Sequence, residues 1–138
     1  MLKLNKIAIA LALLGMTSVA SAQVYEMSFV DSNNATVVKS PSLTWYNPTG
    51  SVSVTAISGL DRKIKLELLK GTTVVETQTS ALITLANRIV ASDGKEFYGI
   101  KFSLSTPAEG NYILRSTVLD IKGVVVTSTD YTFNVDTS

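Results

Sequence analysis

Apolar and polar residues alternate along most of the chain after residue 22, with a period of two rather than 3.6. The clearest run covers residues 63–70, where Ile64, Leu66 and Leu68 share one side and lysine and glutamate side chains share the other. Successive side chains of a β-strand point to opposite faces of its sheet, so the run predicts a strand with one buried and one solvated face. The same alternation predicts strands over residues 51–56, 97–104, 112–118 and 130–135. Their expected inward residues are Val52, Val54, Ala56, Tyr98, Ile100, Phe102, Leu104, Tyr112, Leu114, Val118, Tyr131, Phe133 and Val135.

Turn-forming residues separate these runs. Lys70-Gly71 and Lys122-Gly123 suit tight hairpin turns, because glycine adopts a positive φ at little cost. Short alternating strands with turns between them predict an all-β sandwich or barrel. Residues 81–91 fit neither period well, and we expect a short strand or an irregular crossover there, in which a single helical turn would not disturb the architecture.

The first 22 residues, Met1 to Ala22, have the three parts of a cleavable signal peptide. Lys3 and Lys6 precede the apolar run of residues 7–14, and the segment ends in small residues at 20–22. The run is far shorter than the ~20 residues of a membrane-spanning helix. We therefore expect cleavage before Gln23, one domain over residues 23–138, and a periplasmic, extracellular or cell-surface location.

Removal of the signal peptide changes the charge of the protein. The whole chain has 12 basic and 11 acidic residues, and loss of the two lysines leaves 10 and 11, a net charge of −1. This balance gives no reason to expect a nucleic-acid partner. No second apolar run of membrane length follows, so we expect no membrane span after cleavage. The chain has no cysteine, and the exported domain must be stable without disulfides.

The last third of the chain resembles the closing half of bacterial immunoglobulin-like domains of exported and cell-surface proteins. The resemblance lies in residues 109–114 (EGNYIL), the turn around Gly123 and residues 131–137 (YTFNVDT). It implies an all-β, immunoglobulin-like antiparallel β-sandwich of about seven strands, and it says little about function. Tyr112 suits either a tyrosine corner, whose hydroxyl bonds the backbone before the strand, or a simple core aromatic.

Trp45 is the only tryptophan, and it precedes the second clear strand. Without cysteines and with the tryptophan so early, the chain is not an antibody-type domain. We expect Trp45, with Tyr46 and Pro48, to pack on the edge of the sandwich. An exposed Trp45-Tyr46 pair would instead be a binding anchor.

The residue inventory excludes much chemistry. The absence of histidine and cysteine excludes a Ser-His-Asp triad, a thiol nucleophile, and zinc or iron sites that use these ligands. The carboxylates of Asp93 and Glu96 flank a turn and suit a solvated loop better than a glycosidase pair. Asp61, Asp120 and Asp136 fall at expected turns or strand ends, where calcium ligands or plain turn residues both occur. We therefore predict no catalytic, cofactor-binding or metal-binding residues, no cofactor, and no enzyme activity.

One strand has an unusual outer face. Ile113, Leu119 and Ile121 are apolar at positions expected to face outward. Either a neighbouring strand or loop covers them, or they form a surface for a partner or for self-association.

Two functions therefore remain open. The first is a non-catalytic structural or interaction module, of adhesion type, at the bacterial cell envelope or surface. The alternative is a periplasmic assembly factor or pilus-like subunit that acts by strand exchange. The alternative predicts an incomplete sandwich, or a free N-terminal extension in which residues 23–30 are donated. The sequence is compatible with several partners and oligomeric states, and with either a stand-alone domain or part of a longer multi-domain protein.

Overall fold

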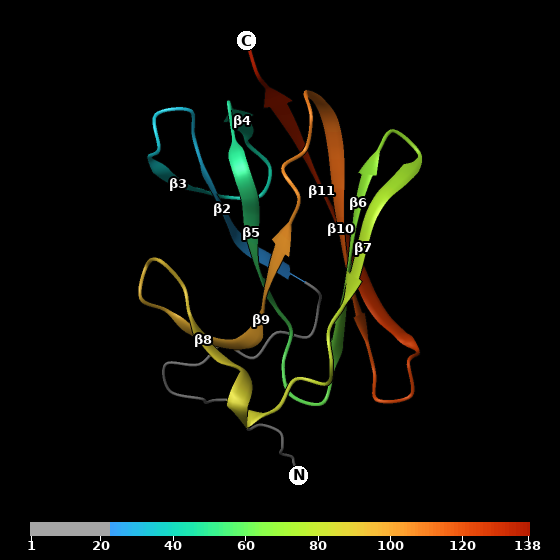
Figure 1. The fold of residues 1–138 in the computed structure, drawn as a ribbon. Helices are drawn as coiled ribbons and strands as arrows, with labels where there is room; N and C mark the ends of the chain where they lie inside the picture. The colour runs from blue at the N-terminus through green and yellow to red at the C-terminus, as the bar shows by residue number, and fades with distance from the viewer. Residues whose placement is uncertain (1–22) are drawn as a thin grey trace.

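The alternating run at residues 63–70 becomes strand β6 (Lys63–Lys70), with Ile64, Leu66 and Leu68 buried as predicted. The computed structural model describes residues 23–138, and the predicted signal peptide over residues 1–22 lies outside the described residues. Ten strands in this part of the chain form two five-stranded sheets that face each other (Figure 1).

The first sheet, called the β10 sheet below, has the strand order β4-β11-β10-β6-β7. Its other members are β4 (Thr44–Tyr46), β7 (Thr73–Thr79), β10 (Gly110–Leu119) and β11 (Val125–Asp136). Neighbours are antiparallel except for β4, which runs parallel to β11.

The second sheet, called the β5 sheet, has the order β3-β2-β5-β9-β8 and is antiparallel throughout. Its strands are β2 (Gln23–Val30), β3 (Thr36–Lys39), β5 (Thr49–Ile57), β8 (Arg88–Val90) and β9 (Glu96–Leu104).

The order of the strands defines the fold. The chain crosses between the sheets after β3, β4, β5, β7 and β9. Strands β2, β5 and β9 adjoin in one sheet, and β11, β10 and β6 adjoin in the other. This is the arrangement of an immunoglobulin-like β-sandwich. Seven strands have seven or more residues, in agreement with the predicted number, and β3, β4 and β8 add short edges of three or four.

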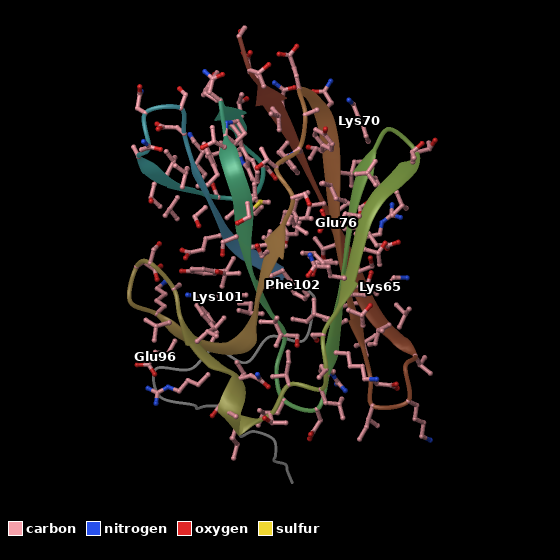
Figure 2. The ribbon with its side chains drawn as sticks, viewed as in Figure 1. Lys65, Lys70, Glu76, Glu96, Lys101 and Phe102 are labelled. Atoms are coloured by element: carbon pink, nitrogen blue, oxygen red, sulfur yellow. The ribbon has the colours of Figure 1, made fainter. Side chains whose placement is uncertain are left out.

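The core lies between the sheets and contains the residues expected there. Of the predicted inward residues, Tyr98, Ile100 and Tyr131 are partly buried against the core, and the others are buried. Figure 2 shows Phe102 pointing from β9 into this space. Phe97 lies on the other side of this strand, where it packs in a second cluster with Ile57 and Ala91.

Trp45 is a correction to the predicted packing at the edge of the sandwich. Its strand, β4, is an edge strand, but the side chain is fully buried. Its ring stacks between Phe29, at 5.2 Å between centroids, and Phe133, at 4.6 Å. The reading of an exposed Trp45-Tyr46 anchor is therefore wrong for Trp45, and only Tyr46 is exposed.

The segment that fits neither period is irregular, as expected. Residues 81–91 hold one turn of 3-10 helix, η1 (Leu85–Asn87), followed by the short strand β8, as the sequence suggested.

Strand β2, which could have been a donated segment, pairs with β3 and β5 of its own sheet. Residues 23–30 are thus the first strand of the domain itself.

Candidate interaction surface

The residues that carry the family resemblance make structural contacts. The Tyr112 hydroxyl donates a hydrogen bond to the Ala108 carbonyl oxygen, 2.7 Å away and four residues before it, which forms the tyrosine corner. The Glu109 carboxylate accepts hydrogen bonds from the Thr137 amide, at 3.1 Å, and from its hydroxyl, at 2.7 Å. Glu109, Tyr112 and Thr137 therefore join the start of β10 to the end of β11.

We expect Tyr112→Phe to lower the free energy of unfolding by about 1 kcal/mol, because it removes one part-buried hydrogen bond. The matched control is Tyr46→Phe at an exposed tyrosine, which should change stability by less than about 0.5 kcal/mol. Urea denaturation followed by circular dichroism measures both. Equal effects of the two substitutions would contradict the tyrosine corner.

The contact of Glu109 with Thr137 predicts an acid-dependent stability. The hydrogen bond from the Thr137 hydroxyl, and then that from its amide, lowers the pKa of Glu109. A lowered folded-state pKa stabilises the protein above the unfolded value of about 4.3, and this stabilisation is lost as the pH falls through the folded value. Glu109→Gln should thus flatten the fall in stability below about pH 4.3. Thr137→Val, which leaves the amide donor, should flatten it partly, and an unchanged acid slope in Glu109→Gln would contradict the prediction.

The pair of carboxylates considered for catalysis makes structural contacts too. Asp93 accepts hydrogen bonds from the Tyr25 hydroxyl and from the Lys95 amide, and the Tyr25 bond is the main cause that lowers the pKa of Asp93. Glu96 forms an ion pair with Arg88 on the neighbouring strand. Figure 2 places Glu96 beside the β8–β9 hairpin and away from the space between the sheets. The pair thus closes a hairpin.

The three aspartates considered for calcium are not brought together. The turn at Asp120 and the end of β11 at Asp136 lie at opposite ends of the β10–β11 hairpin. The Asp120 carboxylate accepts the amides of Lys122 and Val124, as a turn residue does. Asp61 lies near the Asp120 end, because the next strand pairs Lys63 with Leu119. Within residues 23–138, no group of three acidic residues is placed to hold a metal ion.

A hollow of about 420 Å³ lies on the outer face of the β10 sheet, where β4 joins β11. Its lining includes Leu43, Thr44, Ile113, Thr132 and Asn134, and no lining residue is charged. Thr132 and Asn134 alternate with the buried Phe133 and Val135, which places them on the solvent side of the sheet. Ile113, one of the unusual outward residues, is half-buried here beside Leu43.

The turn of the β10–β11 hairpin exposes a group of apolar side chains. Ile121 is 63% exposed, and Val124 and Val125 are each 60% exposed. Leu119, the remaining outward residue, is half-buried and pairs with Val125. The expected cover by a neighbour therefore holds in part for Ile113 and Leu119, whereas Ile121 faces solvent.

One edge of strand β11 is only partly paired with another strand. It pairs with β10 along its length, but with β4 only at Asn134–Asp136. Within the described part of the chain, residues 127–133 therefore have no strand on their second edge. We call this edge, the hollow and the apolar hairpin turn together the β11 surface; the hairpin and β4 can be followed in Figure 1.

A second hollow, of about 490 Å³, lies between β7 and the connection from β9 to β10. Its charged lining residues are Lys70 and Glu76, and both are bonded to the protein. Lys70 donates to the Glu109 carbonyl oxygen, and Glu76 accepts the Ser105 amide. The charged groups of this hollow therefore hold neighbouring segments of the fold together.

Fold and surface together define a class: an immunoglobulin-like β-sandwich with a partly unpaired edge and an exposed apolar hairpin turn. Residues 20–138 match the model of the family described as "Domain of unknown function (DUF4165)". The chain belongs to this family. The matched segment includes all the residues that the structure describes.

No curated protein matches the chain. Among solved structures, the chain is similar to the CARDB domain of a Pyrococcus furiosus protein, which was solved in complex with di-metal ions. The two share 16% sequence identity, the match covers 87% of this chain and 100% of the other, and the TM-score is 0.31.

Proposed function

We propose that the protein is exported after removal of residues 1–22 and acts as a non-catalytic interaction module, of adhesion type, in the periplasm or at the cell surface. Residues 23–138 form its single domain, which holds no catalytic, cofactor-binding or metal-binding residues. The observation that supports this function is the β11 surface, where apolar side chains and an unpaired strand edge lie exposed together. Unpaired edges and exposed apolar groups are the features by which sandwich domains bind partners.

The tripartite pattern of residues 1–22 supports export. Within residues 23–138, no helix is long and apolar enough to cross a membrane. We expect the protein recovered from the periplasm or medium to begin at Gln23, as read by intact mass. Ala22→Glu should block processing because the cleavage site needs small residues at its first and third positions. Ser21→Glu, at the tolerant middle position, is the matched control, and equal processing of both variants would contradict the cleavage site.

The interaction role is tested by binding of the labelled, processed protein to washed envelopes of the cells that produce it. We expect saturable binding that Leu43→Lys weakens, because the substitution puts a charge beside the apolar hollow. Val90→Lys, at an exposed valine of the other sheet, is the control and should bind as the unaltered protein does. Absence of saturable binding, or equal binding of the two variants, would overturn the proposed role of this surface.

A further inference from the structure

The sequence and geometry of the free edge of β11 determine which strand can pair with it. We propose that the partner of the β11 surface is a second copy of this chain, joined by antiparallel pairing of the two β11 strands. The inference rests on the proposed function in that it uses the same surface, and it adds the identity of the occupant.

The edge lacks the devices that normally prevent pairing between molecules. Residues 127–133 (TSTDYTF) contain no proline and no lysine, and most of them favour strands. The register shift against β10 lies before this segment, between Val118 and Leu119, so residues 127–133 form a regular ladder. Asp130 is the only charged residue in the segment, and Arg115 binds its carboxylate at 2.8 and 3.0 Å. A neutral, regular edge of seven residues is thus available to another strand.

The other edges of the sandwich are less suitable. Strand β7 has seven residues, but a register shift against β6 leaves Val75 out of the ladder. Such bulges disturb the regular spacing that an added strand needs. The outer strands of the β5 sheet, β3 and β8, have only four and three residues. Strand β8 pairs with β9 only at Glu96–Tyr98, so residues 99–104 also lack a strand on one edge among the described residues, but they include Lys101, and the Ser103 carbonyl accepts a hydrogen bond from Gln78. The observations therefore favour β11.

Charge excludes the central register of the pairing. In an antiparallel pair related by a two-fold axis perpendicular to the sheet, one residue lies opposite its own copy. Centring on Asp130 would place two carboxylates opposite each other, which is unfavourable. Centring on Thr129 places each Asp130 opposite Ser128 of the other copy. Centring on Tyr131 would instead move the pairing towards Asn134–Asp136, which β4 already occupies. We infer the Thr129 register.

The same register brings the two apolar features together. The exposed hairpin turn lies before the start of the free edge, and the hollow lined by Leu43 and Ile113 lies at its far end. A two-fold rotation about Thr129 exchanges these ends, so the turn of each copy lies beside the hollow of the other. The surface is self-complementary in this sense, as an isologous interface requires.

The register predicts a specific cross-link. The chain has no cysteine, so a single substitution provides a single thiol. Residues directly opposite in antiparallel strands have Cα atoms about 4.5–5.5 Å apart, within the disulfide range. Under mild oxidation, we expect Thr129→Cys in residues 23–138, which hold both sheets, to become mostly covalent dimer. Thr77→Cys, at an exposed residue of the β7 edge, is the matched control and should remain mostly monomer.

The charge argument predicts opposite effects at one position. Ser128→Asp places like charges across the two-fold axis and should weaken dimerisation about threefold, whereas Ser128→Lys should strengthen it about threefold. Both variants lose the same hydrogen bond to Thr117, so each controls for the other. Sedimentation equilibrium over a concentration series measures the dissociation constants.

The outcomes separate this inference from the proposed function. A mass of one copy at every concentration up to about 1 mM would overturn the inference. The dissociation constant would then lie above about 1 mM, which is too weak for a specific dimer. Equal cross-linking of Thr129→Cys and Thr77→Cys would overturn it too. If envelope binding depends on Leu43 while the protein stays monomeric, the proposed function stands and its partner is a different molecule.

Discussion

Trp45→Ala should lower the free energy of unfolding by about 4 kcal/mol, which is a large share of the stability of a domain of this size. The side chain is fully buried and stacks on Phe29 from the β5 sheet and on Phe133 from β11. Phe133 in turn stacks on Tyr112, so one aromatic column connects the two sheets. Without disulfides, no covalent cross-link offsets the cavity that alanine leaves.

The matched variant is Trp45→Phe, which keeps an aromatic ring in the column. The buried indole Nε1 has no hydrogen-bond partner among the described residues, so phenylalanine loses no bond there. We expect a cost of about 1–2 kcal/mol for the smaller ring. Because Trp45 is the only tryptophan, unfolding should be followed by far-ultraviolet circular dichroism. A cost below about 1 kcal/mol for Trp45→Ala would be incompatible with its place in the core.

Gly99→Ala should be the second most damaging of these changes, with an expected cost of about 3 kcal/mol. A Cβ atom at residue 99 would lie 2.2 Å from the carbonyl oxygen of Ala56 and 3.0 Å from the Cα of Ile57. Both contacts are with backbone of the neighbouring strand β5, which pairs with β9 at this point. A backbone atom cannot rotate away, so the two central strands of the β5 sheet must separate locally.

Ser103→Ala is the control on the same strand, because Ser103 is exposed and its change to alanine adds no atom near β5. It should change stability by less than about 0.5 kcal/mol. Thermal and urea unfolding of both variants provide the measurement. If Gly99→Ala were as stable as Ser103→Ala, the close approach of β5 and β9 at this residue would be wrong.

The sequence predicts the central strands well because their alternation is long. Residues 63–70 and 112–118 each repeat the pattern over seven or eight residues, and both become strands with the expected buried faces. Tyr112 was placed correctly at the start of its strand, but only the structure shows that its hydroxyl reaches Ala108. A hydroxyl contact depends on the path of the preceding loop, which periodicity does not describe.

The parts that could not be predicted depend on short elements and distant contacts. Strand β4 has three residues, too few to show a period, and Trp45 is buried because Phe29 and Phe133 come to it from other parts of the chain. Phe97 stands at the other side of its strand, and it is buried only because β8 and Tyr25 cover it. The free edge of β11 could not be predicted either, because it depends on where the pairing between β4 and β11 ends.

The opposite placement of the first and last strands determines how the sandwich carries mechanical load. Strand β2 starts at Gln23 opposite Ile57, whereas β11 finishes at Asp136 beside Tyr46, at the other pole of the fold. A force that pulls these two points apart acts along the strands, so the hydrogen bonds of β2 to β5 and of β11 to β4 and β10 share it in shear. They must break together rather than one by one, and resistance to pulling is then governed by the rate of unfolding.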